Sequence, residues 1–344
     1  MRTHRLLVVL IGLALCAVAL NAAADDYYID PVNGSDSTGD GSQESPWKTL
    51  TYANEQTKCQ GTEGNPVVLH ALAGVYSPST NGDTFPILFY QYPIDQVPHF
   101  GVLAGAGRDV TILHAEGTDR VLKTSGYEIT VADLTVTGGA DPVYHSGGGG
   151  IGASIGAITG SNGSLMIERC VIRDNIDGYG LQVSNSGPVR ITDCEFTGNI
   201  GPNDNYGAAM RFYVQQGVTM TNCLIANNSV YDPSFEGGGP MFYGGSSVML
   251  INCTIVDNDN QGVHGAGVTG YIKLYNCVLW GHEDDIYIGG TMSVEIYHCN
   301  IEDGDGAGSN GNISQDPLFV TGAQGNYYLS HAGVNSKKED KKAK

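Results

Sequence analysis

Apolar and polar residues alternate in short runs that recur six times in the second half of the chain. In each run, apolar residues stand five and three positions before a cysteine, and again two positions after it. The cysteines are 22 to 30 residues apart and stand at Cys170, Cys194, Cys223, Cys253, Cys277 and Cys299. Alternation with period two predicts two short strands per repeat, each with one buried face. A repeat of this length indicates a solenoid.

Two asparagine columns accompany the cysteines. The alternation changes phase just before each cysteine, so a bend is expected there. Asn222, Asn252 and Asn276 stand at this bend, in keeping with turn chemistry. The second column lies five residues after the cysteines and consists of Asn175, Asn199, Asn228 and Asn258, with His282 in the same slot.

A third strand is expected before these two. Eleven residues before five of the cysteines stand Val183, Phe212, Phe242, Ala266 and Ile288, and we expect one register for all five. Three strands per coil, each pairing with the next coil about 4.8 Å away, predict an all-β fold. The specific architecture expected is a right-handed, single-stranded parallel β-helix. Helical repeats are excluded because no 3.6-residue pattern appears and 49 of the 344 residues are glycine.

The first half supplies earlier coils and a cap. Residues 67–76, 100–113 and 128–137 are expected to form strands, with Leu134 in the slot of the cysteines, and residues 138–157 to form a long excursion. Within residues 25–60 we expect a strand and a short helix with Ser45 as N-cap and Pro46 in the first turn. This helix would cover the exposed core of the first coil, with Trp47 facing it.

Both ends differ in composition from the region between them. Residues 1–24 have the charged start, apolar run and small residues of a secretory signal, with cleavage after about Ala24. We therefore expect an exported protein, either secreted or held at the cell surface or in the periplasm, without a membrane span after signal removal. Residues 25–333 form the predicted β-helix, and the lysine-rich residues 334–344 a disordered tail.

Four blocks of the chain resemble a known family. Residues 27–50, 84–87 and 105–113 resemble a domain of unknown function that opens many secreted right-handed β-helix proteins. Residues 311–319 resemble the closing coil of the same proteins, which are members of the pectate-lyase-like superfamily. The resemblance implies the β-helix over nearly all of residues 27–330 and leaves the substrate open. It departs at residues 330–333, where relatives have Ser-Pro-Ala-Ile-Asp.

The negative charge of the chain limits which classes of molecule it can bind. The formal net charge is −19, and most of the basic residues outside the predicted β-helix are in the tail. The region between signal and tail has 10 basic and 34 acidic residues, a net charge of −24. Such a surface repels phosphate backbones, so nucleic acid is excluded as a partner. It also disfavours a polyuronate unless calcium bridges the two.

The cysteine column has two interpretations. The favoured one is a ladder of buried thiols, and the other is pairwise disulfides between coils, which an oxidising compartment would allow. No Cys/His spacing is typical of zinc, and we assign no metal site. Residues 30–41 and 303–306 are oxygen-rich and would accept calcium, although neither matches an EF-hand loop.

Candidate chemistry lies on the outward positions of the third strand. Tyr213 and Tyr243 are expected to stack on adjacent coils beside Arg211. The outward pairs are Gln182/Ser184, Arg211/Tyr213, Met241/Tyr243, Gly265/Gly267 and Tyr287/Gly289. Two long loops, residues 201–207 and 229–238, lead into the strands of the tyrosines and bring Asp204, Tyr206, Tyr231, Asp232 and Glu236. The simpler interpretation is an exposed strand with cross-coil aromatic pairs.

These residues suit two kinds of polysaccharide cleavage. In a lyase, Arg211 would either neutralise the charge of a bound uronate or remove a proton next to it, and Tyr213 would act as the acid. In a hydrolase, Asp204 with Asp232 or Glu236 would be the carboxylate pair. The predicted substrate-binding residues are Tyr206, Tyr231, Tyr243, Met241 and Tyr287.

The histidines are weaker candidates. His264 with Asp284 and Asp285 resembles blocks of polygalacturonases, but the order differs and the Asn-Thr-Asp block is missing. His264 is expected to face inward, and His282 and His298 to be structural residues of the turns.

Two functions remain open. The first is an exported monomer that binds extracellular polysaccharide. One form of this hypothesis adds cleavage of the polysaccharide. The alternative is a non-catalytic adhesin-like or structural protein. A groove in which Arg211, Tyr213 and a loop carboxylate converge would favour the first.

Overall fold

The computed structural model describes residues 25–58, 60–90, 100–125, 127–140, 149–155, 163–185, 187–201, 208–214, 216–231, 237–243, 247–267, 269–322 and 325–329. The predicted signal at residues 1–24 and the predicted tail at residues 334–344 lie outside these ranges. None of the helices in these ranges is both long and apolar enough to cross a membrane.

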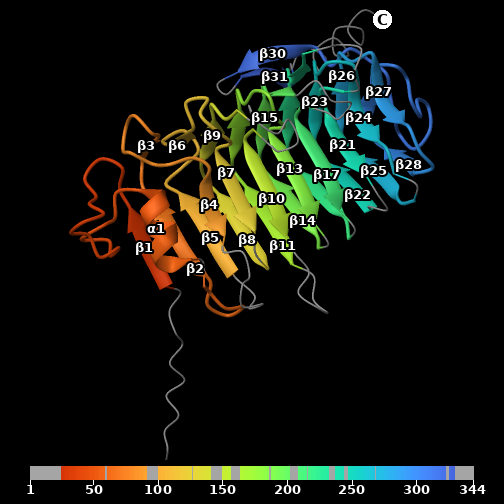
Figure 1. Ribbon diagram of the computed structural model, residues 1–344. Helices are drawn as coiled ribbons and strands as arrows, with labels where there is room; N and C mark the ends of the chain where they lie inside the picture. The colour runs from red at the N-terminus through yellow and green to blue at the C-terminus, as the bar shows by residue number, and fades with distance from the viewer. Residues whose placement is uncertain are drawn as a thin grey trace, which may run out of the picture.

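The chain winds into a right-handed parallel β-helix with three sheets along its sides, as predicted (Figure 1). We name the sheets I, II and III in the order in which each coil visits them.
Sheet I contains β4 (Ile87–Tyr90), β7 (Leu122–Ser125), β10 (Ile151–Ile155), β13 (Leu181–Asn185), β17 (Met210–Val214), β21 (Pro240–Tyr243), β24 (Gln261–Gly265) and β27 (Asp284–Ile288).
Sheet II contains β1 (Asp25–Ile29), β2 (Val67–Ala71), β5 (Phe100–Gly105), β8 (Glu128–Ala132), β11 (Ser164–Glu168), β14 (Val189–Thr192), β18 (Val218–Thr221), β22 (Ser247–Ile251), β25 (Tyr271–Tyr275) and β28 (Ser293–Tyr297).
Sheet III contains β3 (Gly74–Tyr76), β6 (Thr111–His114), β9 (Thr135–Thr137), β12 (Val171–Arg173), β15 (Glu195–Thr197), β19 (Leu224–Ala226), β23 (Thr254–Val256), β26 (Val278–Trp280) and β29 (Asn300–Ile301).

The remaining elements lie outside these sheets. Two short strands, β16 (Ile200–Gly201) and β20 (Ser229–Val230), pair at the turn that follows sheet III. An antiparallel hairpin of β30 (Phe319–Gly322) and β31 (Gly325–Leu329) follows the last coil. The one helix of the described residues is α1 (Leu50–Thr57).

The core is built from rows of side chains at equivalent positions in successive coils. Val189 pairs in register with Leu165 and with Val218, and all three are buried. The bend before each cysteine is a single residue in the left-handed region, with φ between 51° and 59° at Asp133, Arg169, Asp193, Asn222, Asn252, Asn276 and His298. Asparagine and aspartate tolerate this conformation better than most residues, which explains their accumulation there.

The six cysteines form one buried internal row and are free thiols. Each sulfur lies 3.2 to 3.4 Å from the carbonyl oxygen two residues before it. Burial raises the pKa of the Cys194 thiol, which keeps it protonated. Leu134 occupies the same slot one coil earlier and is fully buried, as predicted. The thiol ladder, rather than disulfides, is the arrangement in the structure.

The second asparagine column is a buried hydrogen-bonded ladder. The side-chain amide of Asn175 donates to Oδ1 of Asn199 at 2.9 Å, Asn199 to Asn228 at 2.9 Å, and Asn228 to Asn258 at 2.8 Å. The ladder ends at His282, whose Nε2 lies 3.4 Å from Nδ2 of Asn258. These amides also satisfy backbone groups of the turns, so they fix the shape of the coil corner.

The predicted constant register of the third strand is wrong at one coil. Gly265, not Ala266, pairs with Phe242, and His264 pairs with Met241. The connection from β24 to β25 is one residue longer than its counterparts. The inward residue of β24 therefore stands twelve, not eleven, residues before Cys277. His264 therefore points outward in the column of Arg211, and Gly265 inward. A one-residue shift exchanges the two faces of a strand.

The excursion predicted for residues 138–157 is shorter than expected. Its last part forms β10, which pairs with β7 and β13 and completes sheet I. Two further strands of sheet I, β4 and β7, were also not predicted from the sequence.

A helix covers the N-terminal end of the core, as predicted, but it begins later. Its N-cap is Thr49, whose side chain accepts a hydrogen bond from the amide of Tyr52, not Ser45. Residue Trp47 is extended because its backbone pairs with Tyr28 and Asp30 of the first strand region. Leu50 and Ala53 are fully buried against the first coil.

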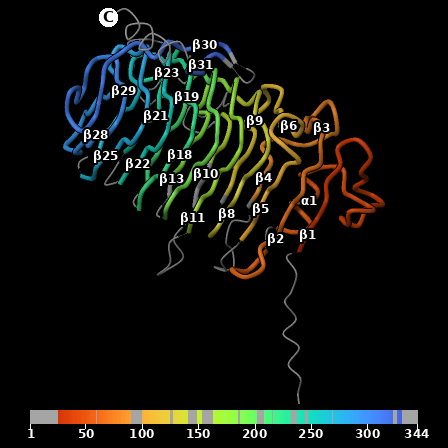
Figure 2. Tube along the Cα trace, turned by 180° about the vertical axis from the view of Figure 1, so that it is seen from behind, coloured from red at the N-terminus to blue at the C-terminus, as the bar shows by residue number. Residues whose placement is uncertain are grey.

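The C-terminal end of the core has no helix against it in the described residues and is partly covered by a further turn of the chain. Ile313 pairs with Asn300, and Oδ1 of Asn312 accepts the amide of Cys299 at 3.0 Å, so residues 311–313 make a partial further coil. The hairpin β30–β31 then folds back along the outside of sheet III (Figure 2). Residues 330–333, where the sequence departs from its relatives, lie outside the described ranges.

Candidate functional site

The outer face of sheet I presents two columns of polar and aromatic side chains. The first contains Gln182, Arg211, Met241, His264 and Tyr287, which pair in register on successive coils. The second column, two residues further along each strand, contains Ser184, Tyr213 and Tyr243.

Arg211 lies beneath the tyrosines and not at the surface. Its side chain is 7% exposed, which corrects the expectation that it faces solvent. Its Nη1 donates to the hydroxyl of the buried Tyr179 at 2.6 Å, and its Nη2 donates to the hydroxyl of Tyr213. The guanidinium carbon is 4.6 Å from the ring centre of Tyr213 and 5.6 Å from that of Tyr243. The cation therefore holds the rings through both hydrogen bonds and cation–π contacts.

Tyr213 and Tyr243 stack as predicted, with ring centres 4.7 Å apart and planes at 16°. Tyr213 is 36% exposed and Tyr243 is half-buried. The two rings contact each other face to face, and on the opposite side the register partner of Tyr213 is Ser184. Ser184 is short and exposed.

Further along the first column the surface is less accessible. Met241 is 1% exposed, so its expected position at the surface is wrong. His264 is also buried, and burial lowers its pKa to about 4, which makes it neutral at pH 7. The ring of Tyr287 packs edge-on against His264, with centres 4.8 Å apart. Tyr287 is half-buried and closes this end of the column.

The loop candidates are mostly outside the described residues. Asp204, Tyr206, Asp232 and Glu236 all lie in ranges that the structure does not describe. Tyr231 is described and is 48% exposed. Burial and a hydrogen bond to the Asp177 carboxylate raise the pKa of Tyr231, so its hydroxyl stays protonated. The structure thus brings together Arg211, Tyr213 and Tyr243, but it does not place the predicted carboxylate pair.

The oxygen-rich loops use their carboxylates internally. Asp36 accepts the amides of Lys48 and Thr49 at 2.8 and 3.0 Å. Asp303 accepts the amides of Asp285 and Asp305 at 3.1 and 3.0 Å. Within the described ranges, no three carboxylate, histidine or cysteine side chains are grouped to hold a metal ion.

His282 contacts a buried carboxylate at the corner of the last coil, at the turn position that the sequence predicts for it. Its side chain is fully buried, and its Nδ1 lies 2.7 Å from Oδ1 of Asp285, which is itself buried. The other carboxylate oxygen of Asp285 accepts the amide of Asp303. This pair continues the asparagine ladder into the last coil. His298 occupies a left-handed turn position, with φ 54°, in agreement with its predicted role.

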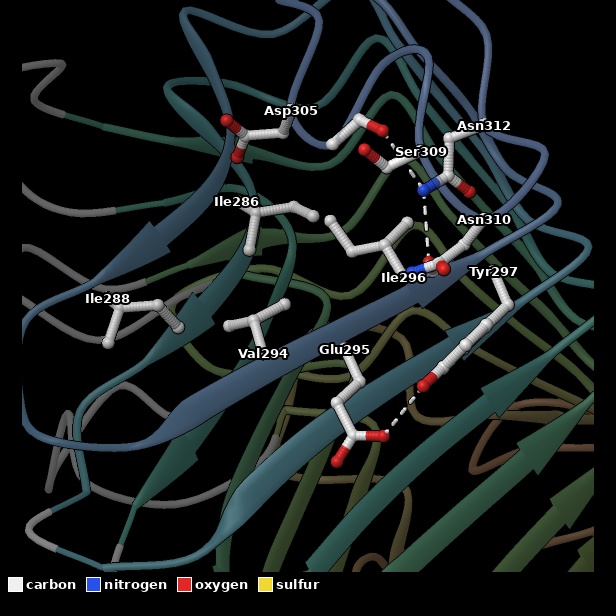
Figure 3. A pocket seen from close by; sticks show the side chains of 11 residues that line it. Ile286, Ile288, Val294, Glu295, Ile296, Tyr297, Asp305, Ser309, Asn310 and Asn312 are labelled. Carbon is white, nitrogen blue, oxygen red and sulfur yellow. Dashed lines mark hydrogen bonds between the residues drawn. The ribbon is translucent and has the colours of Figure 1, made fainter.

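A cavity of about 420 Å³ opens at the C-terminal end of the core (Figure 3). Its apolar wall consists of Ile286, Ile288, Val294 and Ile296, which are the inward residues of the last complete coil. Its polar rim includes Asp305, Asn312 and Glu295, whose carboxylate accepts the hydroxyl of Tyr297 at 3.1 Å. Because the wall continues the core rows, the cavity marks the place where the solenoid stops.

Residues 153–322 match the family model described as the right handed beta helix region. No curated protein matches the chain. Three solved structures are similar to it over most of its length. One is pectate lyase Pel9A, with 15% identity, TM-score 0.45, and coverage of 87% of this chain and 84% of that chain.

The second is a pectin methylesterase mutant in complex with a hexasaccharide, with 12% identity, TM-score 0.36, and coverage of 91% and 76%. The third is GH136 lacto-N-biosidase from Eubacterium ramulus, with 10% identity, TM-score 0.39, and coverage of 83% and 62%.

Proposed function

We propose that this protein is exported and binds an extracellular polysaccharide on the outer face of sheet I. The observation that carries the proposal is the Tyr213–Tyr243 stack, which is partly exposed and held from below by Arg211. Tyrosine rings offer an apolar surface to the C–H groups of a sugar and a hydroxyl to its oxygens. The predicted signal at residues 1–24 supports export.

The stack is prepared for binding before a ligand arrives. Arg211 contacts Tyr213 through its hydroxyl and its ring, and it also contacts the ring of Tyr243. A side chain that is already fixed loses little conformational entropy when a ligand contacts it. We place the first sugar ring on Tyr213, which is 36% exposed, on the side of its short register partner Ser184.

The charge of the chain favours an uncharged polysaccharide. The region between signal and tail has a net charge of −24, which repels a polyuronate at low ionic strength. Arg211 shares its register column on sheet I with Lys123, and the Arg211 guanidinium already binds two tyrosine hydroxyls.

A second candidate, a lyase, is favoured by one contact. Nη2 of Arg211 and the hydroxyl of Tyr213 are hydrogen-bonded, which is the pairing that the lyase hypothesis requires of its cation and its acid. In this version a uronate carboxylate would displace one tyrosine hydroxyl from Arg211, and calcium would offset the negative surface. The adhesin-like or structural function is the alternative that needs neither sugar nor cleavage.

The test is a glycan array with and without calcium, followed by titration of the best ligand and analysis of its products. Tyr243→Ala is expected to weaken binding at least about 10-fold, or ~1.4 kcal/mol, because it removes half of the stack. The matched control is Tyr275→Ala, which removes half of another stack, Tyr275–Tyr297, on sheet II.

Each outcome separates the hypotheses. Binding that depends on Tyr243 without new products supports recognition alone, whereas unsaturated products that disappear in Arg211→Lys and Tyr213→Phe support the lyase. Affinity that is unchanged in both Tyr213→Ala and Tyr243→Ala contradicts the proposed face. An array without any bound glycan favours the adhesin-like or structural function.

A further inference from the structure

The hairpin β30–β31 encloses a second site on a different side of the solenoid. Figures 1 and 2 both show the hairpin beside sheet III, near β23, and Figure 2 also shows β19 next to it. The hydroxyl of Tyr327 attaches it: this oxygen accepts from Nδ2 of Asn227 at 2.7 Å and donates to Oδ2 of Asp257 at 2.9 Å. Asn227 and Asp257 occupy equivalent turn positions in adjacent coils.

A cleft of about 250 Å³ lies between the hairpin and the sheet. Three coils contribute to its floor, through Glu195, Leu224 and Thr254, which pair in register. Asn222 and Asn252 form one side, and Tyr327 and Tyr328 of the hairpin form the other. Tyr328 is 42% exposed, so its ring is accessible from solvent.

The asparagines of the cleft form a row of regularly spaced amides. Nδ2 of Asn222 donates to Oδ1 of Asp193 at 3.0 Å, Nδ2 of Asn252 to Asn222 at 3.2 Å, and Nδ2 of Asn276 to Asn252 at 3.2 Å. Each amide has two N–H groups and two acceptor lone pairs, so each bond leaves further donors and acceptors. Asn222 and Asn252 are exposed, and they repeat at the spacing of the coils.

The side chains that line the cleft carry little net charge, which favours a neutral ligand. Glu195 is the carboxylate of the lining, and Nη2 of Arg108 lies 3.0 Å from it, so its charge is balanced. The remaining side chains combine amides, hydroxyls, one leucine and two aromatic rings. This combination suits a ligand with many hydroxyl groups and apolar C–H faces, and it offers no net charge to an ionic one.

We propose that the cleft between β30–β31 and sheet III binds a neutral sugar, with Asn222 and Asn252 hydrogen-bonded to its hydroxyls and Tyr328 packed on its ring. The site is distinct from the face of sheet I and does not depend on it. Its volume fits one or two sugar rings, which makes it a site for a short glycan or for one segment of a longer chain.

The experiment is saturation-transfer NMR and calorimetry of the full chain with cellobiose, maltose and lactose. We expect at least one of the three to bind with a Kd below about 1 mM. Asn252→Gly and Tyr328→Ala are each expected to weaken it about 10-fold or more. Glycine is chosen because φ is 53° at Asn252, where alanine would strain the turn. Circular dichroism and thermal unfolding verify that each variant folds.

Two control variants make the result specific. Asn276→Gly removes another member of the same row at φ 54°, outside the cleft but hydrogen-bonded to Asn252, and is expected to weaken binding far less than Asn252→Gly does. Tyr243→Ala removes the proposed face on sheet I and is expected to leave the affinity unchanged. The proposal is overturned if none of the three sugars binds, if Asn276→Gly weakens binding as much as Asn252→Gly, or if only Tyr243→Ala weakens it.

Discussion

Asparagine appears in this chain for two different physical reasons. At the bend before the cysteines it is exposed and tolerates a positive φ, whereas five residues later it is buried and connects adjacent coils. The spacing in the sequence separates the two columns, but only the structure shows that the second is a continuous hydrogen-bonded ladder. The two columns therefore respond differently to substitution.

Replacement of the buried amide in Asn228→Ala is expected to lower the free energy of unfolding by about 3 kcal/mol, because several buried partners lose their hydrogen bonds. Urea denaturation followed by circular dichroism measures the effect. The exposed control, Asn276→Gly, is expected to change the free energy by no more than about 0.5 kcal/mol. Equal losses in the two variants would contradict a special role for the buried ladder.

His264 makes stability depend on pH. Its pKa is lowered from 6.5 to about 4 by burial, so the unfolded chain binds a proton that the folded chain does not. Its contribution is fully present above pH 6.5 and is lost as the pH falls toward 4, up to about 3 kcal/mol. The comparison is with His264→Met, across denaturation curves between pH 4 and 7. A difference between the two proteins that is independent of pH would show that burial of His264 does not control its titration.

At the scale of the elements, the strands of the cysteine repeats were predictable because each of them is defined by several aligned copies. The exceptions have local causes. One additional residue between β24 and β25 moved His264 to the outer face, and the extended backbone at Trp47 delayed the start of α1. Neither effect leaves a periodic signal in the sequence.

The candidate site was predictable only where it lies on strands. The stack of Tyr213 and Tyr243 follows from their identical positions in adjacent coils. The burial of Arg211 under these rings could not be predicted from the repeat. It depends on a hydrogen bond to Tyr179, which stands just before β13, one coil earlier than Arg211. The hairpin β30–β31 was missed altogether, since it is an antiparallel pair outside the repeat, and the contacts of Tyr327 join residues 70 and 100 positions apart.

The whole molecule has unequal ends. At the N-terminal end, α1 buries Leu50 and Ala53 against the first coil, whereas at the other end Ile288, Val294 and Ile296 line an open cavity. Each coil of a solenoid is stabilised mainly by its neighbours, so the less covered end opens at lower cost.

Hydrogen exchange is therefore expected to be fastest in β28 and β29 and slower in β2, which is protected by both a neighbouring coil and the cap. Mass spectrometry of peptides from the two ends measures this gradient directly. Val294→Ala, at the open end, is expected to accelerate exchange in β28 and to leave β2 unchanged. Uniform exchange along the molecule would show that the solenoid opens as one unit.

The internal row of thiols has a consequence for how the protein is made. The six cysteines are buried as thiols in the folded coils. All six are accessible in the unfolded chain, where the proposed export would expose them to enzymes that form disulfides. A wrongly joined pair would fix two coils out of register and stop the stack from growing. If the protein is exported as proposed, its folding in an oxidising compartment depends on coils closing over their sulfurs faster than oxidation reaches them.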